Sequence, residues 1–518
     1  MTHTMRVALL VLCTTVYLLL SPGRIIFADD EIVYQTTESL YERGSLAVAG
    51  IPKRSGEPKG RPDGTFGWAP GADGKRYGFF GHGLSIAALP LYAAGKAAIR
   101  RAPETWRHAI RSDTYFLHRR SPQTDWPRLF VSLTNCGITA LAALVLAQWL
   151  TALGYGARIA VATALSYAFA TSAWAYSGTF LSEPLSALML LVGAWAVTRF
   201  LAERDARPRI AARWLLLGAA VVGASVHTHV LNLLAVPAYL LWLGVALGRD
   251  GVRKHRSALV AALAIGAVAL AALGVSNAMR FGSPGETGRV GHYSRFVLPF
   301  EGLAAMVVAP GRSIFIYSPA LLVALWGVAA LRRNHRAVAV FIAAFVLLRW
   351  SFVAARSDWW GGWAIGPRYL LPLVPFMLVP LAEVFAAARR WSGPARAALG
   401  TALLGCIALG LHLAKHNIFE HMVNVARGYE TNAYLDVSHW RASASPIVGF
   451  VELPVDTLSN GALQLARHGH DGLLWVFGGV AVTGTLAALV LGLALLGRRS
   501  TRAADPPSRS HAASPAVS

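Results

Sequence analysis

Charged residues are scarce in this sequence. Of its 518 residues, 14% are Asp, Glu, Lys or Arg, whereas 55% are hydrophobic and the mean hydropathy is +0.47. Soluble proteins carry about 25% charged residues, so a soluble multi-domain enzyme is excluded. Only six residues are lysine, so arginine supplies nearly all of the positive charge.

Cysteines and nucleotide-binding motifs are also scarce or absent. Cys13, Cys136 and Cys406 all fall in apolar stretches, so the sequence indicates neither a disulfide framework nor a metal cluster. It contains no G-x-x-x-x-G-K-S/T, no G-x-G-x-x-G behind a strand and no Asp-x-Asp. A nucleotide-sugar donor or an ATP-driven motor therefore has no recognisable binding site.

Long apolar runs make up most of the chain. Runs of about 17–25 residues can cross the ~30 Å hydrocarbon core, where only helices satisfy the backbone of a single segment. The sequence therefore predicts an all-α polytopic membrane protein with about 12 transmembrane helices. The expected spans are roughly 5–21, 129–151, 158–176, 182–200, 211–227, 230–248, 257–279, 312–331, 337–355, 368–388, 396–414 and 472–497.

The net charge of +22 is concentrated in short connections between these spans. By the positive-inside rule the Arg-rich connections are cytoplasmic, and the Arg-poor ones, such as 280–311, 356–367 and 415–471, are external. Contact with anionic lipid explains this charge, so no nucleic-acid partner is expected. Residues 1–20 could instead be a cleaved signal peptide, which would leave the next residues on the same side.

Three consecutive acids, Asp29, Asp30 and Glu31, directly follow the first apolar run. They could cap a helix over 31–44 that Gly44 ends, or they could perform acid/base chemistry at the membrane surface. The stretch 78–97 is marginally long enough to span. The triplet is inside if this stretch crosses the membrane and outside if it lies along the surface.

Sugar transfer from a phosphate donor needs a carboxylate to take the acceptor proton, cations for the leaving phosphate and aromatic walls. Arg368 follows Gly366-Pro367 at a helix start, where a cation is unfavourable, so we expect an anionic partner for it. The external loops hold candidates of each kind: Asp29, Asp30, Glu31 and Glu183; Lys75, Arg76, Arg295, Arg312 and Arg368; His82, His227, His229 and His292; Trp359, Trp360 and Trp363.

Simpler roles exist for several of these residues. Glu183 is an ordinary acid for the first turn of a helix. The tryptophans could form an interfacial aromatic belt. His227 and His229 could be polar residues that water satisfies. These alternatives stay open at the level of the sequence.

Four stretches resemble the polyprenyl-phosphate-sugar-dependent glycosyltransferases of the GT-C superfamily, which include protein mannosyltransferases and the transferase that adds aminoarabinose to lipid A. They are Asp30-Glu31-Ile32-Val33-Tyr34, the run Ser177–Pro184, the run Pro310–Pro319 and the run Trp359–Pro372. The last, with its Trp-Trp-Gly-Gly-Trp start, is the most specific.

The resemblance implies a GT-C-like bundle whose first loop is external and carries juxtamembrane helices, with 78–97 on the surface. It implies that Asp30 is the catalytic acid, with Asp29 and Glu31 beside it, Glu183 as second acid and Tyr34 in the same motif. The family's phosphate-binding lysine is replaced near Phe79 and Phe80, so Lys75, Arg76 or His82 would substitute. A requirement for a divalent cation is left open.

The expected divisions are a first helix (1–27), an external loop (28–128), a bundle (129–414), an external segment (415–471), a last helix (472–497) and a disordered cytoplasmic tail (498–518). The expected function is transfer of a sugar from a polyprenyl-phosphate donor to a lipid, glycan or protein acceptor, outside the bacterial cytoplasmic (inner) membrane. The alternatives are a transporter or lipid-linked sugar flippase, or a scaffold. Ionisable residues gather at helix ends and in loops, which disfavours a transporter.

Overall fold

The computed structural model describes residues 1–50, 67–108, 121–289, 295–416, 418–429, 434–453 and 471–497. In these ranges the chain is helical apart from loops and one antiparallel ribbon, formed by β1 (Trp68–Pro70) and β2 (Arg76–Gly78). The predicted all-α membrane fold is therefore confirmed. The predicted tail 498–518 lies outside the described residues.

Nine helices of the described residues are long and apolar enough to cross a membrane. They are His3–Leu20, Pro122–Ala152, Glu183–Glu203, Val230–Lys254, Arg256–Phe281, Arg336–Ala354, Arg368–Ala388, Gly393–Ala414 and Leu474–Leu496. The expected count of about 12 stays a prediction. Part of the difference is that the structure breaks some expected spans into pieces.

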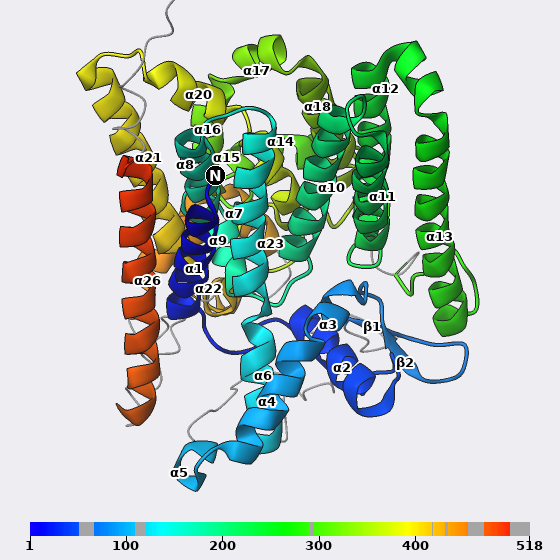
Figure 1. Ribbon diagram of the computed structural model, residues 1–518. Helices are drawn as coiled ribbons and strands as arrows, with labels where there is room; N and C mark the ends of the chain where they lie inside the picture. Colours follow the sequence, from blue (N-terminus) through cyan, green and yellow to red (C-terminus); the bar gives the residue numbers. More distant parts are fainter. Residues whose placement is uncertain are drawn as a thin grey trace, which may run out of the picture.

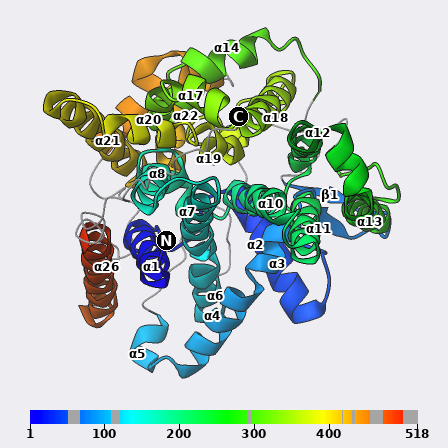
Figure 2. The same ribbon diagram turned by 45° about the horizontal axis from the view of Figure 1, so that its top comes forward.

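The helices stand side by side in a bundle (Figure 1). Figure 2 shows α1, α7 and α10 at its centre, α21 and α26 at one edge and α11 to α13 at the other. The bounds are α1 (His3–Leu20), α7 (Thr134–Ala152), α8 (Ala157–Phe169), α9 (Ala173–Ser177), α10 (Glu183–Glu203), α11 (Pro208–Ser225), η1 (Val230–Leu234), α12 (Ala235–Lys254), α13 (Arg256–Phe281), α14 (Phe300–Val308), α18 (Arg336–Ala354), α21 (Gly393–Ala414) and α26 (Asp471–Gly497).

Proline interrupts two of the expected spans, because it has no backbone N–H and clashes with the preceding turn. The span 312–331 becomes α15 (Ile314–Tyr317), α16 (Ala320–Leu325) and α17 (Val328–Asn334), with Pro319 at the α16 N-cap. The span 368–388 becomes η2 (Arg368–Leu373), α19 (Val374–Met377) and α20 (Leu381–Ala388). Its broken start places Arg368 at the end of the bundle.

The bundle core combines alanines with stacked aromatic rings. Ala140, Ala143 and Ala147 of α7 are fully buried, and small side chains of this kind let membrane helices approach closely. Between α12 and α18, the rings of Trp242 and Phe341 lie 4.7 Å apart. Helix α10, whose first residue is Glu183, packs against α7.

The segment after α1 lies at one end of the bundle as a group of short helices (Figure 1). They are α2 (Ala28–Arg43), α3 (Gly83–Ala87), α4 (Leu89–Arg101), α5 (Glu104–Arg107) and α6 (Pro122–Ser132). The stretch 78–97 contributes α3 and most of α4. A 13-residue helix such as α4 is only about 20 Å long, too short for a ~30 Å core.

The expected external segment 415–471 is described in part. It forms α22 (Ile418–Arg427), α23 (Tyr434–Trp440), η3 (Ala442–Ala444) and α24 (Pro446–Glu452). The backbone N–H of Gly311 donates to the carbonyl of His439 at 3.0 Å, so α23 lies against the turn before α15.

Candidate active site

The three consecutive acids occupy the first turn of α2. The N-cap is Phe27, which makes no side-chain cap bond, so none of the acids caps the helix. The capping alternative is therefore wrong, and the helix starts at Ala28 rather than residue 31. Gly44 ends it at φ 61°, as predicted, in the left-handed conformation that glycine adopts easily. The acids are favoured at this end by the helix dipole.

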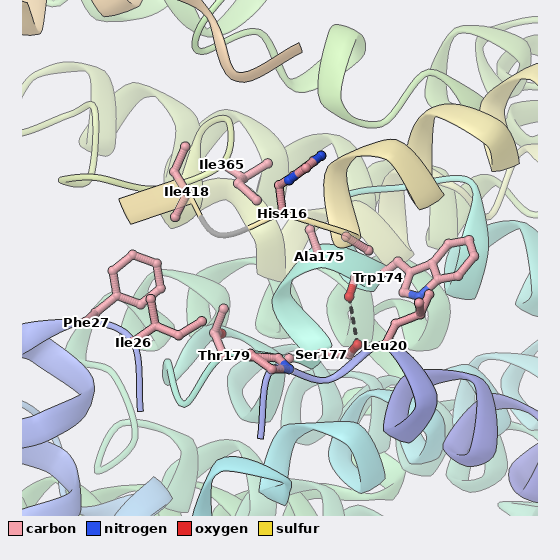
Figure 3. Close-up of a pocket in the computed structure, with 13 residues that line it drawn as sticks. Leu20, Ile26, Phe27, Trp174, Ala175, Ser177, Thr179, Ile365, His416 and Ile418 are labelled. Atoms are coloured by element: carbon pink, nitrogen blue, oxygen red, sulfur yellow. Dashed lines mark hydrogen bonds between the residues drawn. The ribbon is translucent and has the colours of Figure 1, made fainter. Parts of the chain in front are cut away.

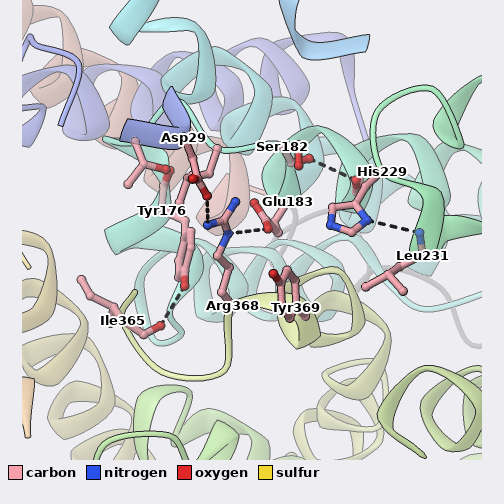
Figure 4. A network of polar contacts seen from close by, with 12 residues as sticks. Asp29, Tyr176, Ser182, Glu183, His229, Leu231, Ile365, Arg368 and Tyr369 are labelled. Carbon is pink, nitrogen blue, oxygen red and sulfur yellow. Dashed lines mark hydrogen bonds and ion pairs between the residues drawn. The ribbon is translucent and has the colours of Figure 1, made fainter. Parts of the chain in front are cut away.

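Arg368 joins acids from two other parts of the chain. Its Nη1 lies 2.8 Å from Asp29 Oδ2 of α2, and its Nε lies 2.6 Å from Glu183 Oε1 of α10 (Figure 4). Glu183 is fully buried, and Arg368 is 8% exposed. The expected anionic partners of Arg368 are thus two protein carboxylates. The structure brings α2, α10 and η2 together at one point.

Asp30 is fully buried next to this ion-pair network. Its Oδ2 accepts the backbone N–H of Phe180 at 3.1 Å, whereas its Oδ1 has no hydrogen-bond partner among the described residues. Burial raises the pKa of Asp30 well above its usual value, and the N–H of Phe180 and the charge of Arg368 only partly oppose this. Such a carboxylate, once ionised, is a strong proton acceptor.

Glu31 points to a different partner. It forms a buried ion pair with Arg128 of α6, in which Arg128 Nη2 lies 3.1 Å from Glu31 Oε1, and it also accepts from Gln35 at 3.0 Å. The Arg128 guanidinium lies 4.1 Å above the ring of Tyr34, which packs against Tyr92. Glu31 and Tyr34 therefore connect α2 to α6 and α4.

Replacing Arg128 by Met is expected to destabilise the protein without removing a reacting group. The change leaves the Glu31 carboxylate buried and unpaired, which costs about 3–5 kcal/mol. A thermal melt of the full chain in detergent measures this loss. The double variant Glu31→Gln/Arg128→Met should recover most of the stability. If Glu31→Gln were stable yet inactive, Glu31 would belong to the chemistry instead.

A second cationic cluster adjoins Arg368, and the sequence did not single it out. Arg289 Nη2 contacts Asp358 Oδ2 at 2.9 Å and the hydroxyl of Tyr369 at 3.0 Å. Arg356 binds the same carboxylate at 2.7 and 2.9 Å. The Nε of Arg289 is buried with no partner among the described residues. The signal available in the sequence was the Arg-x-Asp spacing of 356–358, inside a loop that the charge pattern predicts to be external.

His229 and Arg349 support this cluster from the bundle side. His229 accepts from the backbone N–H of Leu231, and its ring lies 5.8 Å from that of Tyr369 (Figure 4). Burial lowers the pKa of His229 well below its usual value, and Arg349 and Arg289 add to the effect, so this imidazole is neutral. Arg349 donates to the Tyr369 carbonyl at 2.7 Å.

The environment of Arg312 differs from the one expected of a phosphate-binding residue. It is buried and donates to three backbone carbonyls, at 2.5 Å to Ala364, 3.3 Å to Gly366 and 3.2 Å to Gly362. These bonds hold the loop that leads to Arg368. Arg312 thus supports Arg368 indirectly through the loop backbone.

The tryptophans of the loop before Arg368 contact the segment 418–440. Trp363 donates to the Tyr434 hydroxyl at 3.3 Å, and its ring lies 5.0 Å from Phe419. Trp359 and Trp360 lie 5.2 and 5.6 Å from the ring of His439. These contacts join the loop before Arg368 to α22 and α23.

The remaining cationic candidates are held elsewhere. Lys75 is exposed and pairs with Asp73 at 3.0 Å, and Arg76 donates to the Ala49 carbonyl at 2.7 Å. The ring of His82 lies 5.2 Å from that of His227, and burial lowers the pKa of His82 to about 4, with Arg280 and His227 adding to the shift. His292 lies outside the described residues.

A metal ion does not fit the acids that are described. No group of three or more His, Cys, Asp and Glu side chains in the described ranges is arranged to hold one. Asp29 and Glu183 converge, but both are neutralised by Arg368, which stands where a cation would.

A small pocket lies beside the start of α2 (Figure 3). Its walls include Ile26 and Phe27 before α2, Trp174 of α9, and Ile365 and Ile418. Its volume is about 30 Å³, far below the ~300–1,000 Å³ of small-molecule sites. The Tyr176 hydroxyl, which lies near Arg368, donates to the carbonyl of Ile365, a residue of the pocket wall (Figure 4).

Comparison with known proteins adds a family match and a fold. Residues 129–248, less than a quarter of the chain, match the family described as the N-terminal domain of protein O-mannosyl-transferase TMEM260. No curated protein matches the sequence.

Several solved structures are similar to this chain, among them an oligosaccharyltransferase and ArnT. The oligosaccharyltransferase of Archaeoglobus fulgidus in the apo form is 12% identical with TM-score 0.50, over 85% of this chain and 60% of that chain. ArnT from Cupriavidus metallidurans bound to undecaprenyl phosphate is 15% identical with TM-score 0.49, over 95% of this chain and 76% of that one. The segment 129–248 is thus similar to the N-terminal domain of a protein O-mannosyl-transferase, and the helix arrangement shared with the oligosaccharyltransferase confirms the expected GT-C-like fold.

Proposed function

We propose that this protein is a membrane glycosyltransferase that moves a sugar from a polyprenyl-phosphate donor to an acceptor hydroxyl. The observation that carries the proposal is the Asp30 carboxyl, buried with one oxygen unpaired, next to the network of Arg368. A proton acceptor beside guanidinium groups is what this transfer requires. The absence of a nucleotide motif in the sequence favours a lipid-linked donor.

The proposed mechanism is a single inverting displacement. Asp30 takes the proton of the acceptor hydroxyl while the acceptor oxygen attacks the anomeric carbon. The bond between that carbon and the phosphate oxygen breaks, and the polyprenyl phosphate leaves with the electron pair. Because the developing charge is on phosphate, guanidinium groups stabilise it.

Arg368 and Arg289 are the best placed of these groups. Arg368 uses Nε and Nη1 for Glu183 and Asp29, and its Nη2 makes no bond within the described part of the chain. The Nε of Arg289 likewise makes no hydrogen bond to the described residues. Glu183 and Asp29 are positioning residues that orient Arg368. Arg312 holds the backbone of the loop that precedes Arg368. The segment 415–471, which contacts Trp363, is where an acceptor would be selected.

The proposed location is the bacterial cytoplasmic membrane, with the site facing outside. Charge distribution supports this orientation. The connection 249–256, at the bundle end opposite α2, carries three arginines and one lysine against a single acid. Such loops remain cytoplasmic by the positive-inside rule.

The test is a transfer assay with the purified full chain in sealed vesicles. The donors are a panel of polyprenyl-phosphate sugars, chosen by mass spectrometry of the lipid-linked sugars that accumulate in a deletion strain. We expect release of polyprenyl phosphate together with a glycosylated acceptor, only when the acceptor is on the α2 side. Movement of labelled sugar-lipid across the bilayer without a covalent product would instead establish a flippase.

A further inference from the structure

A large apolar groove lies in the membrane region, away from the acids and arginines described above. It is formed by α10, α11, α12 and α13, and its volume is about 570 Å³. In Figure 1, α13 is the outermost helix on this side, with α11 and α12 between it and α10. Apolar side chains at the groove are openly exposed, including Val260 (64%) and Leu263 (53%). Exposed apolar surface of this extent marks a binding site or a lipid contact.

Glycines shape the groove in two ways. A Cβ on Gly223 would lie 2.9 Å from Ala269 Cβ, so this glycine brings α11 close to α13. Gly244 of α12 and Gly266 of α13 also line the groove, but a Cβ on either would meet nothing within 4 Å. These two glycines therefore leave open space that larger side chains would fill.

One end of the groove is strongly basic. Arg256 is the single charged residue among the described residues that line it, and it makes no ion pair within the described part of the chain. Gly248, at φ 62° and ψ −178°, breaks α12, and Val252 after the break lines the groove. The residues after the break also include Arg249, Arg253 and Lys254, the last paired with Asp205 at 2.6 Å.

The basic end is opposite the candidate active site. Arg256 begins α13, whose other end carries Arg280, a donor to the Gly78 carbonyl of the ribbon at 3.0 Å. A helix of 26 residues is about 39 Å long, so the two ends lie at different membrane faces. A donor lipid whose phosphate sits at Arg368 would place its uncharged tail beside Arg256.

We propose that this groove binds a phospholipid with an anionic headgroup, taken from the leaflet opposite the active site. The headgroup phosphate pairs with Arg256 at the mouth, and the acyl chains lie along Val260, Leu263 and the open space at Gly244 and Gly266. A bound lipid of this kind fills the gap between α11, α12 and α13. It thereby steadies the end of α13 that leads to Arg289.

The test is native mass spectrometry of the full chain released from vesicles of phosphatidylcholine with added phosphatidylglycerol of the same acyl chains. We expect the wild type to retain phosphatidylglycerol preferentially. Arg256→Gln should lower the phosphatidylglycerol affinity about fivefold, since a basic residue near the surface contributes roughly that factor, and leave phosphatidylcholine unchanged. Gly266→Leu should displace both lipids.

Matched controls lie elsewhere in the chain. Gly400→Leu is on α21, where an added Cβ also meets nothing within 4 Å, and Arg333→Gln removes a basic residue from the end of α17. Both should bind lipid as the wild type does.

Equal retention of the two phospholipids by the wild type, or unchanged retention by Gly266→Leu, would overturn the proposal. If polyprenyl phosphate displaced the bound phospholipids equally well from the wild type and from Arg256→Gln, the groove would instead bind the tail of the donor. Because binding is measured without transfer, the result is independent of the proposed activity.

Discussion

Asp30→Asn is expected to abolish transfer and, at neutral pH, to raise the melting temperature. The amide cannot accept the acceptor's proton, and loss of a general base typically costs about 10²–10⁴-fold in rate. The amide oxygen can still accept the backbone N–H of Phe180, so the local structure is kept. The transfer assay and a thermal melt of the same purified sample measure both effects. Near-normal turnover would refute the role of Asp30.

The gain in stability follows from the raised pKa of Asp30. Because burial raises this pKa in the folded state, the folded protein holds the proton more tightly than the unfolded chain does. The group's contribution to stability is therefore present at low pH and is lost as the pH rises through the range between the two pKa values. The stability difference between Asp30→Asn and the wild type should vanish in acid and grow toward neutral pH. Transfer by the wild type should rise over the same range, as the base ionises.

Asp73→Asn is the matched control. Asp73 is a carboxylate of the same segment, but it pairs with Lys75 on the exposed hairpin. Its removal should leave transfer unchanged, which shows that the effect at Asp30 is specific to the site.

Arg368→Gln is expected to be both destabilising and inactive. It leaves Glu183, which is fully buried, and Asp29 without their cation. Breaking a buried pair in this way costs about 3–5 kcal/mol. Loss of a group that stabilises the transition-state charge lowers the rate by about 10²–10³-fold. A thermal melt and the transfer assay separate the two losses.

A double variant distinguishes structure from chemistry at Arg368. Glu183→Gln/Arg368→Gln removes both charges of the shorter pair and should regain most of the stability. It should remain inactive, because the phosphate still lacks its cation. Recovery of transfer together with stability would mean that Arg368 is only a structural partner of the acids. Arg368→Lys should also be impaired, since an ammonium cannot reproduce the planar fork that reaches two carboxylates.

The acids and Arg368 could be singled out from the sequence because of where they stand in the chain. Acids are costly at a membrane surface, and a cation at a helix start is unfavourable unless an anionic group lies nearby. The structure supplies that partner from Asp29 and Glu183, which lie far apart in the sequence. The sequence could not reveal the contact between Arg289 and Asp358, because these residues lie far apart in the chain.

For Arg312 the sequence suggested a role that the structure does not support. Arg312 lies in a stretch that resembles the family, which suggested phosphate binding, but its guanidinium donates to backbone carbonyls of the loop, including that of Gly366. A sequence does not tell where loop carbonyls will point, so such a role is visible only in three dimensions.

The bounds of a helix could be predicted from the sequence where the length of the apolar run alone sets them. The expected span 257–279 matches α13 closely. Prolines shortened or broke other spans, as at Pro319. The stretch 78–97 was ambiguous in length, and its division into α3 and α4 depends on packing against α2 and α6.

The most direct test of the central claim is an electron cryomicroscopy map of the full chain with bound polyprenyl phosphate. The proposed mechanism predicts that the phosphate lies within hydrogen-bond reach of Arg368 or Arg289, with Asp30 Oδ1 facing the adjacent space. A phosphate bound at the opposite membrane face, or on the exposed hairpin at Lys75 and Arg76, would contradict it.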